Sequence, residues 1–397
     1  MLSYIVLFTL LGISAGCSSL SQRHPPPGDQ VYDRHILPGV PAVRAWSGTL
    51  SSEFTADLIE SVHQEERARI RIDSEGSPNT NVLALSGGSI YGAFGAGFMD
   101  GWTQSGTRPM FKMVTGISTG AIIAPFAFIG QNYDSLLKVM FTTTNTDDIY
   151  SYRGLSILWS ESLLNSAPLA NLIEKYFTHD VLEAVAQAHR QGRRLYVGTT
   201  NLDEDRMVVW NMGAIANSGH PKALDLFHKV ILASSSIPAV FPPVFINVEV
   251  YGKTYDEMHV DGGINAEIFL TAATVNITEI RNQLRSQKAS DARTSIFIIR
   301  NAAMSSSPKP MPRNIVQISK QAIISLTKSQ AIKDLVHIYD IAQKQGFDYN
   351  WVSLPDIENA TMVNFDTEEM HRLYKIGYEM GLKGNAWRKE PPSAHAY

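Results

Sequence analysis

Short apolar runs alternate along this chain with longer segments in which apolar residues recur every three or four positions. Short runs rich in β-branched and aromatic residues are typical of buried strands. They lie near residues 81–86, 111–117, 193–200, 206–210, 257–261, 294–300 and 348–354. Because strands that alternate with helices favour a layered architecture, the pattern predicts a three-layer α/β/α fold with a central, mainly parallel sheet. Asp203-Glu204-Asp205 is a turn between two of these strands, so one pairing is predicted to be antiparallel.

Four stretches carry the apolar spacing of amphipathic helices, at residues 52–71, 163–188, 312–345 and 367–382. The first is interpreted as a helix that caps the sheet, and a helix on a membrane surface is the alternative. The second is predicted to break into two helices near His179. The third and longest has an apolar stripe formed by Ile315, Ile318, Ala322, Leu326, Leu335 and Ile338. A scaffold helix across the sheet is favoured over a membrane-docking helix.

The N-terminal region contains an apolar run from Leu2 to Ile13, followed by Ser14-Ala-Gly-Cys17. A transmembrane helix needs about 20 apolar residues, so residues 1–16 are better explained as a secretory signal peptide. A cysteine directly after Ala-Gly resembles the lipobox of bacterial lipoproteins, in which that cysteine is acylated, although Ser14 stands where leucine is usual. Cys17 is therefore the predicted lipidation site, with ordinary signal cleavage or an uncleaved anchor as alternatives. The predicted location is the cell envelope, where the protein is anchored to a membrane by a lipid. This membrane is the outer membrane if the host has one, and a secreted protein is the alternative.

Composition narrows the class of protein. The chain has 397 residues, of which 44% are hydrophobic and 18% charged, so it can bury a large core. A net charge of −4 without any run of Lys and Arg gives no support to nucleic-acid binding. The chain has a single cysteine, which excludes an internal disulfide framework. The predicted organisation is a tether and N-terminal capping segment at 17–79, one main domain at 80–385 and a C-terminal tail at 386–397.

The predicted strand at 111–117 runs into Gly116-x-Ser118-x-Gly120, and an apolar helix start follows. A tight strand-to-helix turn needs small residues, because glycine accepts φ values that a Cβ would block. Such a turn lifts the Ser118 hydroxyl above the sheet edge, where the first N–H groups of the new helix also point. This arrangement suits a nucleophile that attacks an acyl carbonyl, and a chance occurrence of the motif is the alternative.

A glycine-rich turn precedes this motif, running Gly87-Gly88-Ser89-Ile-Tyr91-Gly92 after the strand at 81–86. Successive backbone N–H groups in such a turn bind anions, and in an acyl-transfer enzyme the anion is the tetrahedral oxyanion. A nucleotide phosphate loop is disfavoured, because no Lys-Ser/Thr follows and no acidic residue lies at the distance expected for a ribose. A close packing turn between strand and helix is the structural alternative.

The third motif is His259-Val-Asp261-Gly262-Gly263. Asp261 could accept the Ser118 proton directly as a general base, provided that burial raises its pKa from the reference value of about 3.9. An ordinary turn is the alternative. The histidines after Asp261 are His337, His371 and His395, and none has a loop context that suggests catalysis. A Ser–Asp dyad is therefore favoured over a triad.

In this order the three motifs resemble the patatin-like phospholipase family. Residues 194–201 with 208–211, and the A-S-x-x-x-P pattern within 233–243, extend the resemblance over residues 81–273. The resemblance implies that Ser118 is the nucleophile and Asp261 its base, and that no metal or cofactor is required. It also implies an oxyanion hole at Gly87, Gly88 and Ser89, and motif glycines at Gly92, Gly116, Gly120, Gly262 and Gly263.

The glycine loop departs from the family pattern G-G-G-x-R-G at two positions, where Ser89 replaces the third glycine and Tyr91 the arginine. Ser89 must then adopt a backbone conformation that glycine takes more easily, or the loop must differ slightly. Without the arginine, a fixed positive charge is missing beside the site. The substrate therefore stays open between phospholipids and neutral esters.

The predicted function is a serine acyl hydrolase that cleaves carboxylic ester bonds of lipids at a membrane surface, which it reaches through its N-terminal anchor. A non-catalytic envelope lipoprotein that keeps the fold as a binding or scaffolding module is the alternative. A peptidase or thioesterase with the same nucleophile is a second one. Apolar side chains close to the motifs could line an acyl channel, but a place in the hydrophobic core is favoured for them; they are Phe94, Phe98, Phe126 and the run 240–245. Residues 154–159 are a candidate flap over the site.

Overall fold

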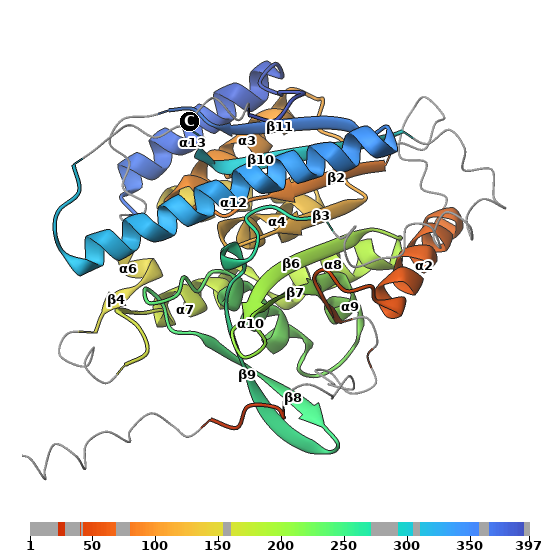
Figure 1. Cartoon of the computed structure of the whole chain (residues 1–397). Coiled ribbons are helices and arrows are strands. Elements are labelled where there is room, and N and C mark those ends of the chain that lie inside the picture. The colour runs from red at the N-terminus through yellow and green to blue at the C-terminus, as the bar shows by residue number, and fades with distance from the viewer. Residues whose placement is uncertain are drawn as a thin grey trace, which may run out of the picture.

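A mixed sheet lies at the centre of the molecule (Figure 1). The computed structural model describes residues 23–27, 40, 43–68, 80–153, 160–270, 293–304, 310–356 and 365–392. Within these residues nine strands join the sheet in the order β1-β7-β6-β3-β2-β10-β11, with β9 paired to β6 and β8 to β9. Their bounds are β1 Arg44–Trp46, β2 Thr80–Leu85, β3 Met113–Gly116, β6 Arg194–Asn201, β7 Arg206–Asn211, β8 Val244–Val250, β9 Lys253–Asp261, β10 Thr294–Ala303 and β11 Asp348–Leu354.

The strands β6, β3, β2, β10 and β11 run parallel to one another, and the other strands add antiparallel pairs at one side. The mainly parallel sheet predicted from the sequence is confirmed, and so are all seven predicted strands. The antiparallel pair expected around Asp203-Glu204-Asp205 is β6 with β7. The sequence analysis missed β1 and β8. The strand β1 has three residues, too few to show a period, and β8 begins at the end of an apolar run that had been considered only as core or channel lining.

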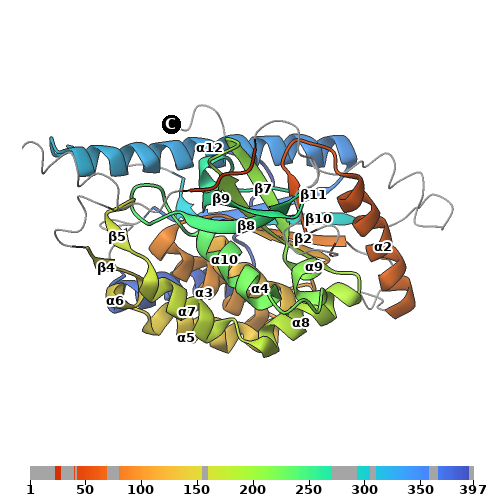
Figure 2. The ribbon, with the colours of Figure 1, turned by 90° about the horizontal axis from the view of Figure 1, so that it is seen from below.

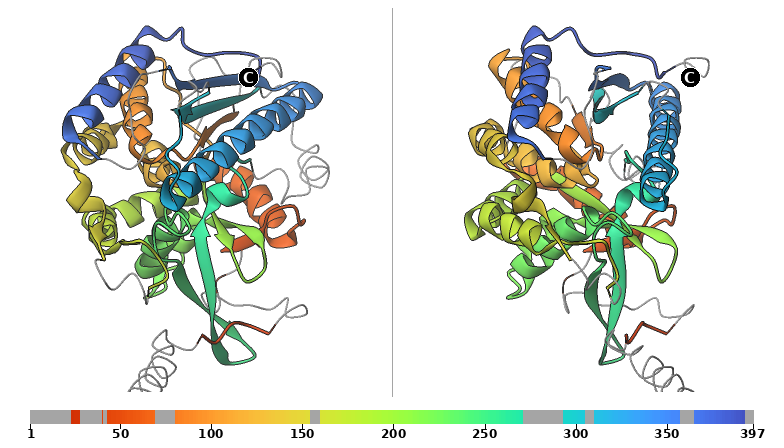
Figure 3. Two further views of the ribbon diagram at one scale, coloured as in Figure 1. Left: turned by 60° about the vertical axis from the view of Figure 1, so that its left-hand side comes forward. Right: turned by 90° about the vertical axis from the view of Figure 1, so that its left-hand side faces the viewer.

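Helices cover both faces of the sheet, in unequal numbers (Figures 2 and 3). One face carries α3 Gly92–Gln104, α4 Thr119–Ile129, α5 Asp134–Thr143, α7 Ala167–Tyr176, α8 His179–Arg190, α10 Ala223–Ser234 and α13 Thr367–Lys383. The opposite face carries the long helix α12 (Ile315–Gln345) and the shorter α2 (Ser52–Ala68). Phe54 of α2 stacks on Tyr196 of β6 at a centroid distance of 5.6 Å, which confirms α2 as a cap on the sheet. The three-layer α/β/α architecture is therefore as predicted.

Reciprocal glycines pack α3 directly against α13. A Cβ on Gly97 or Gly101 would lie 2.0 Å from the carbonyl oxygen of Tyr374 or Tyr378, and one on Gly377 would lie 2.0 Å from that of Phe94. Only hydrogen fits at these positions, so the two backbones touch. The N-terminal end of α3 carries the glycine-rich turn, and α13 therefore helps to hold that turn in place.

The helix α12 is a scaffold along only part of its length. In its second half, Leu335 and Ile338 are fully buried against Ile298, Tyr349 and Trp351 of the sheet, as predicted. In its first half, Ile318 and Leu326 are 54% and 70% exposed, so these two members of the apolar stripe face solvent. Apolar side chains follow one face of the helix, but only its second half packs into this cluster on the sheet.

Both ends of the described chain pack on the body. Arg23 bridges Asp203 and Asp256 at 2.7 and 2.9 Å, which holds residues 23–27 along the projecting β8–β9 hairpin (Figure 1). Trp387 packs edge-on against Phe98 and Phe297, with centroid distances of 5.1 and 5.2 Å. The start of the predicted C-terminal tail at 386–397 is therefore held on the domain at Trp387. The side chain of Trp387 holds these residues in place, and its aromatic partners lie far away in the sequence.

Several predicted features lie outside the described residues. These are the signal peptide at 1–16, the lipidation site Cys17, the flap at 154–159 and His395. Among the helices that the structure does describe, none is both long and apolar enough to cross a bilayer.

Candidate active site

Ser118 occupies a strained turn between β3 and α4. Its φ and ψ are 53° and −124°, a backbone conformation that residues with a Cβ rarely adopt. Glycine is required on both sides of Ser118 because neighbouring backbone atoms leave no room for a Cβ there. A Cβ on Gly116 would lie 2.4 Å from the carbonyl oxygen of Gly120, and one on Gly120 would lie 2.3 Å from that of Leu85. The Ser234 hydroxyl accepts the Ser118 N–H at 2.9 Å and so fixes the turn from α10.

Asp261 is the last residue of β9 and lies beside Ser118. Its carboxylate accepts the Gly263 N–H at 2.8 Å and interacts with the Ser118 side chain. The following glycine allows a close approach, because a Cβ on Gly262 would lie 2.5 Å from the Gly198 carbonyl oxygen. Burial raises the pKa of Asp261 to about 7, and the interactions with Ser118 and with the Gly263 N–H oppose that rise. The carboxylate is therefore a stronger base than an exposed aspartate.

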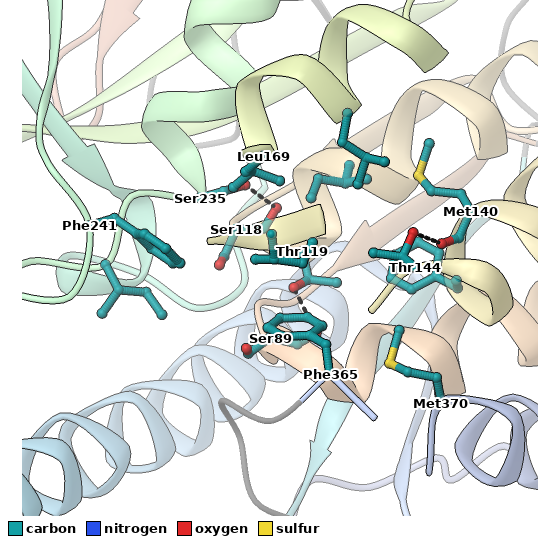
Figure 4. Close-up of a pocket in the computed structure, with 15 residues that line it drawn as sticks. Ser89, Ser118, Thr119, Met140, Thr144, Leu169, Ser235, Phe241, Phe365 and Met370 are labelled. Atoms are coloured by element: carbon teal, nitrogen blue, oxygen red, sulfur yellow. Dashed lines mark hydrogen bonds between the residues drawn. The ribbon is translucent and has the colours of Figure 1, made fainter. Parts of the chain in front are cut away.

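The glycine-rich turn lies against the same serine. A Cβ on Gly87 would lie 3.1 Å from the Ser118 Cβ, and one on Gly92 would lie 1.9 Å from the Thr119 Cγ2. The Thr119 hydroxyl donates to the Ser89 carbonyl oxygen at 3.0 Å (Figure 4). Ser89 has φ of 52°, the left-handed conformation expected for a residue in place of glycine. The turn and the serine are thus parts of one packed unit.

Asn301, at the end of β10, holds the start of this turn. Its side-chain amide donates to the Ser86 carbonyl oxygen at 2.6 Å, and its N–H donates to the Ser86 hydroxyl at 3.0 Å. A Cβ on Gly88 would lie 2.7 Å from the Asn301 Cβ, so the Asn301 side chain also packs directly against the turn. Sequence analysis missed Asn301 and Ser234. Each acts through contacts with residues more than a hundred positions away, so no local pattern marks either of them.

An apolar cavity opens on one side of Ser118 (Figure 4). Its walls come from helices on one face of the sheet and from the chain before β8 and before α13. The apolar lining residues are Ile122, Met140, Phe141, Ile149, Leu169, Leu172, Ile237, Phe241, Phe365 and Met370. Phe241 belongs to the run 240–245 considered for a channel, whereas Phe94, Phe98 and Phe126 are fully buried in the core, as favoured from the sequence.

A second, more polar cavity opens on the other side of Ser118. Gly87, Gly88 and Asp261 line it, together with two charged side chains that sequence analysis did not single out, Glu267 and Arg300. The first half of α12 covers it with Ile323, Ile324 and Thr327. Ser118 therefore lines both cavities, the apolar one and the more polar one.

No described histidine lines either cavity. His259 is fully buried, where its ring nitrogens lie 3.0 Å from the Thr199 hydroxyl and 3.2 Å from a Glu257 carboxylate oxygen. Burial lowers the pKa of His259. Among the described residues, no group of three or more His, Cys, Asp or Glu side chains is arranged to hold a metal ion.

In a layered α/β fold, a serine at a strained strand-to-helix turn is the arrangement that exposes the nucleophile of α/β hydrolases. Residues 83–275 match the family model described as patatin-like phospholipase. That match supports lipid hydrolase activity.

Three further comparisons are more distant. The chain is 27% identical over 176 residues to an uncharacterized protein of Acanthamoeba polyphaga mimivirus, covering 43% of this chain and 56% of that protein. The chain thus matches little more than half the length of that curated relative. VipD from Legionella pneumophila aligns with a TM-score of 0.34 and 11% identity, over 78% of this chain and 67% of that one. Human GIVD cytosolic phospholipase A2 aligns with a TM-score of 0.33 and 10% identity, over 87% and 65%.

Proposed function

We propose that the protein is a serine acyl hydrolase that cleaves carboxylic ester bonds of lipids. The observation that carries the proposal is the position of the buried Asp261 carboxylate beside the Ser118 side chain, with the glycine-rich turn directly against the same serine. A hydroxyl becomes a useful nucleophile when an adjacent base takes its proton. The raised pKa of Asp261, about 7, suits a base that works near neutral pH.

In the proposed reaction Ser118 attacks the ester carbonyl while Asp261 takes the hydroxyl proton. The oxyanion that forms is stabilised by backbone N–H groups of Gly87, Gly88 and Ser89. Asp261 then returns its proton to the departing alcohol, which leaves an acyl-Ser118 ester. Water, deprotonated by Asp261, hydrolyses that ester and restores the serine. The apolar cavity accepts the acyl chain, because burying methylene groups stabilises the complex by about 0.8 kcal/mol each.

The test is to replace each member of the pair in the full chain. Ser118→Ala and Asp261→Asn are each expected to reduce hydrolysis of p-nitrophenyl butyrate by roughly a thousandfold or more, while thermal unfolding stays cooperative. Ser235→Ala is the matched control, because this serine lines the same cavity and donates to the Ser118 carbonyl oxygen at 3.4 Å.

A fluorophosphonate probe adds a readout that is independent of substrate choice. Labelling is expected in the wild type and in Ser235→Ala, and is expected to be absent in Ser118→Ala. A folded wild type that takes up no probe and turns over no ester would instead favour the non-catalytic envelope lipoprotein. A panel of ester, thioester and amide substrates separates a lipid esterase from a thioesterase or peptidase.

We further propose that the protein is attached to a membrane by a lipid on Cys17. The sequence around Cys17 supports this, and the ion pairs of Arg23 hold the chain six residues later against the β8–β9 hairpin. Cys17→Ser is expected to abolish incorporation of labelled palmitate and to release the protein from the membrane fraction. Labelling that persists in Cys17→Ser would contradict this site.

A further inference from the structure

The polar cavity beside Ser118 contains a buried carboxyl group that the proposed reaction does not use. Glu267 follows the turn after Asp261, lines this cavity and is 6% exposed. Among the described residues that line the polar cavity, Asp261 and Glu267 are the only two with a carboxyl group. Taking a carboxyl group out of water is costly, so the place of Glu267 beside the nucleophile calls for an explanation.

Two glycines bring the Glu267 carboxyl group close to Ser118 and Asp261. A Cβ on Gly87 would lie 3.1 Å from the Ser118 Cβ and 3.1 Å from the Glu267 Oε2. A Cβ on Gly263 would lie 2.7 Å from the Glu267 Oε1 and 3.1 Å from the Asp261 Oδ1. The two carboxyl oxygens are therefore no more than about 6 Å apart, a gap that one water molecule bridges with two hydrogen bonds of up to about 3.0 Å each.

The structure holds Glu267 in this place from two sides. The Asp334 carboxylate of α12 accepts the N–H groups of Glu267 and Ile268 at 2.8 and 3.0 Å, and Ile268 is buried in the cluster that packs α12 on the sheet. The Glu267 Oε2 lies 3.5 Å from the Arg300 Nη1, while the Oε1 lies beside Gly263. The Oε1 is therefore the oxygen that is held close to Asp261.

The chemistry of this carboxyl group suits a hydrogen-bond acceptor. Burial raises the pKa of Glu267 to about 8, and the charge of Arg300 opposes that rise. In either protonation state a carboxyl group keeps an oxygen that accepts a hydrogen bond. Glu267 can therefore hold a water molecule without taking a proton from it.

The second half of the proposed reaction needs a water molecule on the Asp261 side of Ser118. The polar cavity is the one that Asp261 lines, whereas the acyl chain of the acyl-Ser118 ester is expected in the apolar cavity. The attacking water must reach both the ester carbonyl and Asp261, so its place is in the polar cavity. Glu267 is the other carboxyl group there.

We propose that Glu267 positions the water molecule that hydrolyses the acyl-Ser118 ester. This inference rests on the proposed function and assigns a residue to its second step. The water oxygen bonds to the ester carbonyl carbon, Asp261 takes one water proton, and Glu267 accepts a hydrogen bond from the other. The bond from that carbon to the Ser118 oxygen then breaks, Asp261 returns the proton to the serine, and a carboxylic acid leaves. Glu267 neither gains nor loses a proton.

The test follows the two halves of the reaction separately in the full chain. After mixing with p-nitrophenyl butyrate, rapid quenching and intact-mass spectrometry measure how fast butyryl-Ser118 forms and how fast it disappears. Glu267→Ala is expected to slow the disappearance roughly 10-fold, because the water loses the hydrogen bond that orients it. Formation is expected to change less than about twofold, since that step needs no water.

Three further variants separate water positioning from a structural role. Glu267→Gln keeps an accepting oxygen and is expected to hydrolyse the acyl ester within about threefold of the wild-type rate. Glu267→Leu fills the space without an accepting oxygen and is expected to behave like Glu267→Ala, so the test does not depend on one variant folding. Asp134→Ala is the matched control, because it removes the partner of another buried arginine, Arg108, outside the lining of both cavities. It is expected to lower the unfolding temperature and to leave both rates unchanged.

Disappearance of butyryl-Ser118 at the wild-type rate in Glu267→Ala and Glu267→Leu would overturn the assignment. So would equal slowing of formation and disappearance, the same slowing in Asp134→Ala, or a Glu267→Gln variant as slow as Glu267→Ala. Failure of the proposed function gives a different result, because the wild type would then form no butyryl-Ser118 and take up no fluorophosphonate. That result would reject both proposals, whereas a wild type that forms and hydrolyses the acyl ester leaves Glu267 alone under test.

Discussion

At the scale of single residues, two carboxyl groups lie close together in this site but face different surroundings. Asp261 accepts the Gly263 N–H and lies beside the Ser118 side chain, whereas the Glu267 carboxylate lies 3.5 Å from Arg300. Burial raises the pKa of both, to about 7 and about 8. Each of the two carboxyl groups is therefore harder to ionise than an exposed carboxyl group.

A pH profile of ester hydrolysis tests the raised pKa of Asp261. Asp261 must be ionised to take the proton, so kcat/KM for p-nitrophenyl butyrate is expected to fall about tenfold for each pH unit below about 6 and to level off above about 8. The midpoint is expected near 7. Activity that stays constant down to pH 5 would contradict Asp261 as the base, provided that unfolding curves show a folded protein over the same range.

The raised pKa also makes a prediction about stability. An aspartate normally has a pKa near 3.9, so in Asp261 the folded protein holds a proton that the unfolded chain releases. Between these two values stability falls as pH rises, by on the order of 4 kcal/mol in total, and above about 7 the loss is complete. Asp261→Asn, which keeps the shape without the charge, is expected to unfold at a higher temperature than the wild type at pH 8.

The comparison at low pH is the control for that variant. At pH 5 Asp261 is largely protonated in the folded state, so the difference in unfolding temperature is expected to shrink strongly. A difference that is the same at both pH values would mean that the asparagine acts through packing rather than through charge.

At the scale of elements, the helix α12 has two distinct parts. Its second half is packed onto the sheet through Leu335 and Ile338, and its first half covers the polar cavity through Ile323 and Ile324 while Leu326 faces solvent. The sequence predicted the helix and its apolar stripe correctly. It could not show where along the helix the stripe packs onto the sheet, because that depends on strands distant in the chain.

A matched pair of substitutions distinguishes the two halves. Leu335→Ala is expected to lower the free energy of unfolding by about 2–5 kcal/mol, because it leaves a cavity in a fully buried cluster. Leu326→Ala is expected to change it by no more than about 0.5 kcal/mol, since that side chain is 70% exposed. Chemical denaturation of both variants checks this, and equal losses would contradict the packing described for α12.

At the scale of the whole molecule, the sheet brings three distant strand ends to one place. Ser118 follows β3, Asp261 ends β9 and Arg300 lies near the end of β10, and each reaches the cleft between the glycine-rich turn and α12. The carboxyl ends of the parallel strands β3 and β10 share one edge, which is where such folds build their sites. The strand β9 is antiparallel to β6 and brings Asp261 to the same place. The fold thereby places the side chains of Ser118, Asp261 and Arg300 around one cavity.

The sequence alone determined the parts of this protein whose chemistry is local. Sharp turns require the glycines on either side of Ser118, the two glycines after Asp261 and the glycine-rich run that begins at Gly87. The spacing of apolar residues, with periods of about 2 and 3.6 residues, predicted most of the strands and helices. Tertiary structure alone decided which distant groups meet there, including Asn301 on Ser86, Ser234 on the Ser118 amide and Arg300 beside Glu267. These contacts depend on strand order and on burial, and neither leaves a signal in a short stretch of sequence.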